Sequence, residues 1–159
     1  MRFLIVEALW DGLNPTRETE WQQTLMDINR KHDGSVVTVT VGRRDDGGAT
    51  LAVEGLDGGP AEIALTFDMM RDHFRDYREI ITRLARADLG AFGMRDWEVL
   101  DMAKKGVHDE AGMRIKRAFK PWVPLDLKFA RRIFTLVFLV TNDLPGALVK
   151  KHRTHGLPS

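Results

Sequence analysis

Cysteine is absent from this chain of 159 residues. Its absence excludes disulfide bonds, thiolate metal sites and cysteine nucleophiles, and it fits a reducing compartment, so we expect a cytoplasmic protein. Long apolar runs are also missing. No segment approaches the roughly 18 apolar residues that a membrane-spanning helix needs, and Glu7 interrupts the first apolar run before it reaches signal-peptide length. The sequence therefore predicts neither secretion nor membrane insertion.

Motifs of high specificity for catalysis, metals or nucleotides are likewise missing. Two Gly-rich segments, 45–48 and 57–60, lack the spacing of a phosphate-binding or calcium-binding loop, and we interpret both as hairpin turns. His108 is followed directly by Asp109 and Glu110, whose side chains would project from a helix in different directions. We therefore expect no metal ion and no cofactor.

The N-terminal half carries the patterns of a helix and several strands. A short alternating run over residues 3–6 predicts a strand, and apolar residues at helical spacing over 21–28 predict a helix that Thr16 caps and 33–34 end. Between residues 35 and 65 the apolar period changes to two. This period predicts three antiparallel strands.

The C-terminal half is predicted to be helical. The first helix carries one apolar stripe behind a cap at Thr66, and its members are Phe67, Met70, Phe74, Tyr77, Ile81 and Leu84. The second runs from about 95 to 119 and contains Gly106 and Gly112, each of which implies a kink, a close crossing by another element or a ligand against the backbone. Asp126 caps a third helix through about residue 139, and its apolar surface predicts a place in the core or in a subunit interface.

These elements predict one α+β domain over residues 1–143. A small antiparallel sheet from the N-terminal half would pack against a C-terminal layer of about three helices. Residues 144–159 form a basic tail with no apolar period, which we expect to be mobile. Two histidines in this tail, His152 and His155, are poor candidates for metal ligands for that reason.

Charge is distributed unevenly along the chain. Residues 1–66 hold 6 Lys and Arg against 11 Asp and Glu, a net charge of −5, whereas residues 67–159 have a net charge of +6. The stretch 114–153 alone holds 10 basic and 2 acidic residues. This basic region suggests an anionic partner, which could be a nucleic acid or the acidic half of the same or a neighbouring subunit.

A family resemblance rests on two helical segments. The first reads Glu-Val-Leu-Asp-Met-Ala-Lys-Lys-Gly-Val-His-Asp-Glu-Ala-Gly over residues 98–112, and the second is Asp126 followed by Ala-Arg-Arg-Ile-Phe-Thr-Leu over 130–136. Residues 94–140 thereby resemble uncharacterised protein family 0262, a group of small alphaproteobacterial proteins. The resemblance implies a fold and a candidate surface, and it implies no activity. The chain departs from the family pattern where Lys104 and Lys105 replace arginines, which removes the bidentate fork of a guanidinium.

The candidate site lies on the helix that carries these lysines. Residues at spacings of three and four place acidic and basic groups on one polar stripe, which the final helix could extend: Asp101, Lys104, Lys105 and His108, with Arg131 and Arg132. Such a set could bind a phosphate or a carboxylate, with His108 as a general acid or base. The alternative is structural: Asp101 and Lys105 form an ordinary pair, His108 packs, and the arginines bridge helices. We expect Arg131 to be buried in a pair and Lys104 and Lys105 to be partly exposed.

The leading functional hypothesis is a regulatory or adaptor protein that is not an enzyme. It would act through protein contacts and associate with itself, as the apolar final helix and the oppositely charged halves suggest. A binding protein or small enzyme for an anionic ligand is the alternative. Nucleic-acid binding through the basic region is a third hypothesis, although no recognition motif accompanies the charge.

Overall fold

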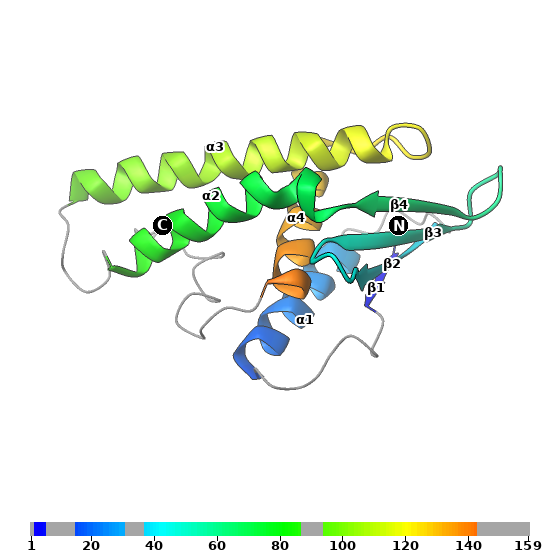
Figure 1. Cartoon of the computed structure of the whole chain (residues 1–159), viewed down its shortest axis with the longest axis horizontal. Helices are drawn as coiled ribbons and strands as arrows, with labels where there is room; N and C mark the ends of the chain where they lie inside the picture. Colours follow the sequence, from blue (N-terminus) through cyan, green and yellow to red (C-terminus); the bar gives the residue numbers. More distant parts are fainter. Residues whose placement is uncertain (1, 6–14, 31–36, 87–93, 143–159) are drawn as a thin grey trace.

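The computed structural model describes residues 2–5, 15–30, 37–86 and 94–142. It has the predicted α+β architecture, with one sheet and the helices that follow it (Figure 1). The strands are β1 (Arg2–Ile5), β2 (Thr38–Arg43), β3 (Ala49–Glu54) and β4 (Ala61–Leu65). The helices are α1 (Pro15–Arg30), α2 (Phe67–Arg86), α3 (Met94–Phe119) and α4 (Leu127–Thr141). The predicted tail over 144–159 lies outside the described residues.

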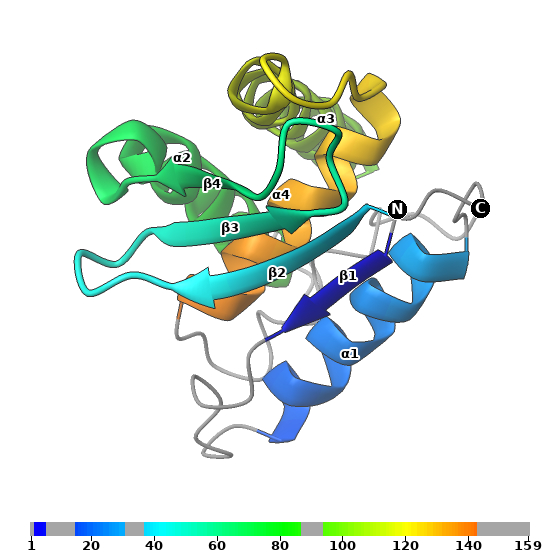
Figure 2. The same ribbon diagram turned by 90° about the vertical axis from the view of Figure 1, so that its right-hand side faces the viewer.

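The sheet has the strand order β1-β2-β3-β4 (Figure 2). Strands β2, β3 and β4 are antiparallel neighbours, as the period of two predicted. In β2 to β4 every second side chain is buried on one face, and this face consists of Val39, Val41, Ala49, Leu51, Val53, Ile63 and Leu65. The alternation therefore selects the face that packs on the core.

Strand β1 departs from the antiparallel arrangement because it pairs in parallel with β2. Parallel neighbours need a crossover connection, and α1 lies in the chain between them. The crossover helix begins at Pro15, which is favoured in the first turn because its backbone has no N–H to leave unsatisfied. Thr16 is therefore inside α1 and not at its cap, so the predicted start was wrong by one residue or more. The predicted end at 33–34 lies outside the described residues.

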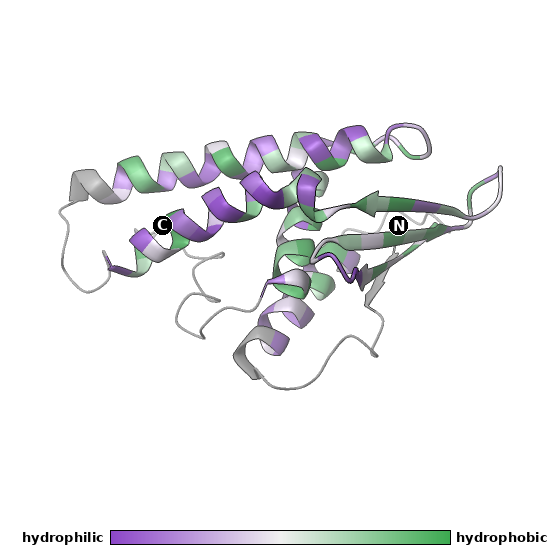
Figure 3. Cartoon of the chain, in the orientation of Figure 1, coloured by the Kyte–Doolittle hydropathy of each residue, from purple (hydrophilic) through white to green (hydrophobic). Residues whose placement is uncertain are grey.

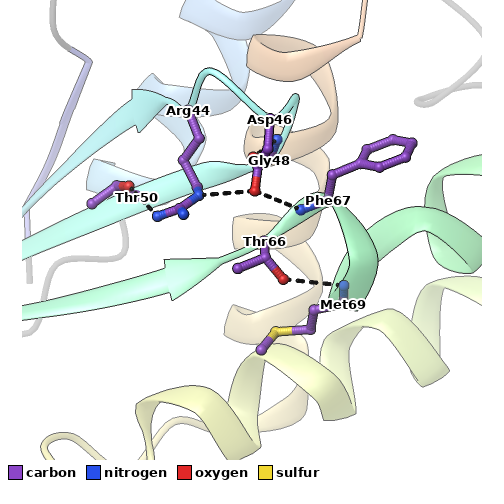
Figure 4. Close-up of polar contacts among 7 residues, drawn as sticks. All are labelled: Arg44, Asp46, Gly48, Thr50, Thr66, Phe67 and Met69. Atoms are coloured by element: carbon purple, nitrogen blue, oxygen red, sulfur yellow. Dashed lines mark hydrogen bonds and ion pairs between the residues drawn. The ribbon is translucent and has the colours of Figure 1, made fainter.

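The turn between β2 and β3 also fixes the start of α2 (Figure 4). The Asp46 carboxylate accepts hydrogen bonds from the backbone N–H of Gly48 at 2.8 Å and of Phe67 at 3.4 Å. Gly47 has a φ of 93°, which a side chain would disfavour. Thr66 caps α2 as predicted, because its hydroxyl accepts from the N–H of Met69 at 3.2 Å. Phe67 is exposed, contrary to its predicted place in the buried stripe, because its ring lies over the turn at Gly47.

Helix α4 is the central helix of the core. Its predicted cap is present, since the Asp126 carboxylate accepts from the N–H of Phe129 at 2.7 Å. All side chains from Ile133 to Thr141 are buried, and α4 packs against α1, α3 and β2. Figure 3 shows the apolar character of α4 beside the hydrophilic outer side of α2. The sequence predicted a place for this helix either in the core or in a subunit interface, and in the structure the helix lies in the core.

Candidate functional site

Helices α3 and α4 approach each other closely at Gly112. A Cβ atom at this position would lie 2.9 Å from Cγ of Arg131 and 3.1 Å from Cδ1 of Leu127. Of the three explanations for this glycine, a close crossing by another element is therefore the one observed. The crossing brings the polar residues of α3 next to Arg131.

His108 connects the two helices just N-terminal to the crossing. Its Nε2 lies 3.0 Å from the carbonyl oxygen of Arg131 and 2.9 Å from the hydroxyl oxygen of Thr135. Because a carbonyl oxygen only accepts, we assign the proton to Nε2, which donates toward both oxygens. The ring packs against those of Tyr77 and Phe134, with centroids 5.5 Å and 5.7 Å away. Nε2 is thus committed to a contact between helices and is not positioned as a general base.

Lys104 is the buried charge of the group. Lys104 is only 2% exposed, because it lies on the same side of α3 as Leu100, Ala111 and Ile115. The prediction of partial exposure was therefore wrong for Lys104. The pKa of Lys104 is lowered to about 8, mainly by burial and to a smaller extent by the positive charge of Arg131, while the negative charge of Asp101 opposes both effects.

Arg131 and Lys105 both have acidic neighbours. Nε of Arg131 lies 3.2 Å from Oδ1 of Asp109, close enough for an ion pair but not aligned as a hydrogen bond. The expected pairing of Arg131 is present, but the prediction that the residue is buried was wrong, because its side chain is 32% exposed. Nζ of Lys105 lies 3.9 Å from Oδ2 of Asp101, and the lysine side chain is 60% exposed, as expected. Such an exposed pair contributes little to stability.

Arg132, the last member of the predicted set, is half-buried on α4. Taken together, the polar cluster consists of Asp101, Lys104, Lys105, His108, Asp109, Arg131 and Thr135. Its lysines and arginine outnumber its carboxylates by one, and two of its cations, Lys104 and Arg131, are close enough to repel each other. The cluster can attract an anion, while most of its polar groups also contact one another. Among the described residues, no three His, Asp or Glu side chains converge as metal ligands would.

Two further surfaces were not identified from the sequence. One is a groove of 560 Å³ between the β3–β4 turn and the connector 121–124, with the exposed Trp122 on its wall. From the sequence, residues 57–60 were interpreted only as a hairpin turn, because nothing local indicates that this turn meets residues 121–124. The connector begins directly after α3, whose C-terminal end is brought near the sheet by the α3–α4 packing.

The other surface is the outer face of α3, which we define as Val99, Met102, Gly106 and Met113. Val99 is 59% exposed, Met102 73% and Met113 40%. Among the described residues, none lies within 4 Å of a Cβ atom placed at Gly106, so packing between the described elements does not explain this glycine. The sequence does not distinguish these exposed apolar residues from the buried ones, because both sets recur at helical spacing along the same helix.

The fold and these surfaces define a small α+β protein in which a mixed sheet and the helices α1, α2 and α3 pack around the apolar helix α4. The chain belongs to the uncharacterised protein family UPF0262, whose model matches residues 12–142, which confirms the resemblance. A UPF0262 protein of Methylobacterium radiotolerans is 29% identical over 132 residues, which cover 79% of this chain and 81% of the relative. No solved structure matches the chain. In the part of the chain that the structure describes, none of the helices combines the length and apolarity needed to cross a membrane.

Proposed function

We propose that this protein is a cytoplasmic regulatory or adaptor protein, not an enzyme, that acts through protein contacts and associates with itself. The outer face of α3 carries this proposal. Exposed methionines and a valine on one helix face lose contact with water when a partner covers them, and flexible methionines adapt well to a partner surface. The apolar helix α4 no longer supports self-association, because its side chains are buried within the chain.

The test compares the same substitution at two exposed methionines. Met102→Glu places a charge on the outer face of α3, and Met26→Glu places the same charge on α1, where Met26 is 59% exposed. Neither change removes a core contact, so both variants should unfold within about 0.5 kcal/mol of the parent. Multi-angle light scattering at high micromolar concentration should show oligomers for the parent and Met26→Glu and a monomer for Met102→Glu. A parent that is monomeric throughout would remove self-association from the proposal.

A second candidate function is the binding of an anionic ligand at the polar cluster. The observation that favours it is the proximity of Lys104 and Arg131, two cations whose repulsion an anion would relieve. The informative variant is Lys105→Gln, because His108 and Arg131 also hold α3 and α4 together. Inorganic phosphate and citrate should raise the melting temperature of the parent and have less effect on this variant. Equal effects on both proteins would contradict an anion site here.

A further inference from the structure

The outer face of α3 is bordered by two edges of different charge pattern. At about 100° per residue, one edge lies toward α4 and the other toward α2. The α4 edge consists of Glu98, Lys105, Asp109 and Lys116, of which Asp109 contacts Arg131 of α4. The α2 edge consists of Ala103, Glu110 and Arg117, of which Glu110 interacts electrostatically with His73 of α2. Both views place α3 at the periphery of the molecule (Figures 1 and 2).

The charges of the α4 edge are complementary to the charges of the same edge on a second copy of α3 that runs in the opposite direction. Glu98 and Lys116 stand nine residues before and after Val107, and Lys105 and Asp109 stand two residues before and after it. Each pair joins opposite charges. Glu98 and Lys116 are about 27 Å apart along the helix, at 1.5 Å per residue, so they cannot pair within one chain.

The apolar residues follow the same symmetry. Met102 stands five residues before Val107 and Met113 six residues after it, so each would lie at the level of the other on a reversed copy. Gly106 stands almost at the centre, where two helices that cross approach most closely. The open space over Gly106 leaves room for a second backbone there.

We propose that two copies of this chain pair through their α3 helices in antiparallel orientation, about a two-fold axis near Gly106 and Val107. This inference rests on the proposed self-association and specifies its geometry. Met102 of one copy packs against Met113 of the other on both sides of the axis. Glu98 then lies beside Lys116 of the second copy, and Lys105 beside Asp109 of the second copy.

Symmetry and charge favour this orientation over the parallel one. A two-fold axis perpendicular to antiparallel helices brings the same edge of both helices together, whereas an axis along parallel helices brings opposite edges together. Parallel pairing would place Asp109 beside Glu110 of the second copy and Lys116 beside Arg117 of the second copy. Those contacts join like charges, which oppose association.

Introduced cysteines test the orientation, because the chain has none of its own. In the antiparallel pair, the two Met102 positions lie about 15 Å apart along the helices, beyond the reach of a disulfide. Met102→Cys alone and Met113→Cys alone should therefore form little disulfide-linked dimer under mild oxidation, and an equimolar mixture of the two should form it readily. Met102→Cys that cross-links to itself while the mixture gains nothing would overturn the antiparallel geometry.

Charge reversal provides an independent measurement. Glu98→Lys and Lys116→Glu should each weaken dimerisation roughly tenfold, because each replaces two attractive contacts per dimer by repulsive ones, and the double variant should regain the parent affinity. Glu62→Lys, on the exposed face of β4, is the control and should leave the affinity unchanged. A parent that dimerises without this rescue would refute the geometry and leave self-association standing, whereas a parent that remains monomeric would refute both.

Discussion

The two glycines of α3 offer the sharpest test of the packing between α3 and α4. Gly106→Ala and Gly112→Ala make the same chemical change in the same helix. Alanine is favoured over glycine in a helix interior by about 1 kcal/mol. At Gly106 the new methyl group meets no atom of the described elements within 4 Å, so the variant should gain about this amount in free energy of unfolding.

At Gly112 the sign is reversed. The new Cβ would lie 2.9 Å from Cγ of Arg131, an atom near the α4 backbone that cannot move away without moving the side chain or the helix. Overpacking of this kind costs roughly 1–3 kcal/mol, which exceeds the gain in helix propensity. We therefore expect Gly112→Ala to lower the free energy of unfolding by about 1 kcal/mol.

Urea denaturation of dilute protein, where association does not contribute, measures both effects. The free energies of unfolding of the two variants should lie on opposite sides of the parent value and differ from each other by about 2 kcal/mol. Their melting temperatures should shift in the same directions by roughly 2–4 °C per kcal/mol. If Gly112→Ala stabilises the protein as much as Gly106→Ala, then α4 does not cross α3 at this distance, and the described geometry of the polar cluster is wrong.

Three further predictions concern the cluster and the start of α2. Because the pKa of Lys104 is about 8 in the folded chain against 10.5 for an ordinary lysine, the unfolded chain binds more protons between these values, so stability should rise by up to roughly 3 kcal/mol from pH 8 upward. The raised pKa of buried Tyr77 opposes this rise in stability above about pH 10. Urea titrations at successive pH values should show no such rise for Lys104→Met; an unchanged rise in that variant would contradict the lowered pKa of Lys104. Thr135→Val should cost about 1 kcal/mol in thermal unfolding, since it keeps the shape and removes the hydroxyl between His108 and Arg131, and an unchanged melting temperature would argue against that contact. Thr66→Ala should also cost about 1 kcal/mol through the lost cap on α2, whereas Thr82→Ala, at an exposed site inside the same helix, should cost less; equal losses would speak against the cap.

Local patterns in the sequence were sufficient for most of the helices and strands. The apolar stripe of α2, the period of two across β2 to β4 and the cap at Asp126 each arise from residues within one element, and all three are present in the structure. Phe67 fits the same pattern but is exposed, because the β2–β3 turn and not the core lies next to it.

Contacts between distant elements could not be predicted in the same way. The sequence does not distinguish Gly106 from Gly112. The position of α4 decides that Gly112 lies at a close helix crossing and that Gly106 lies on an open surface. Lys104 and Lys105 are adjacent and chemically identical, yet one is buried and the other exposed because the core lies on one side of α3. The direction of β1 depends on α1 as a crossover, which no pattern inside the strand encodes.

In the proposed function, the outer face of α3 is the contact surface of this protein. The backbone amide signal of Gly106 in ¹H–¹⁵N spectra tests this claim most directly, with Gly59 in the β3–β4 turn as the reference. Over a dilution series from millimolar to low micromolar protein, the Gly106 signal should shift or broaden with concentration, and the Gly59 signal should stay constant. A Gly106 signal that does not change while the molecular mass rises above the 18.1 kDa of one chain would contradict the account.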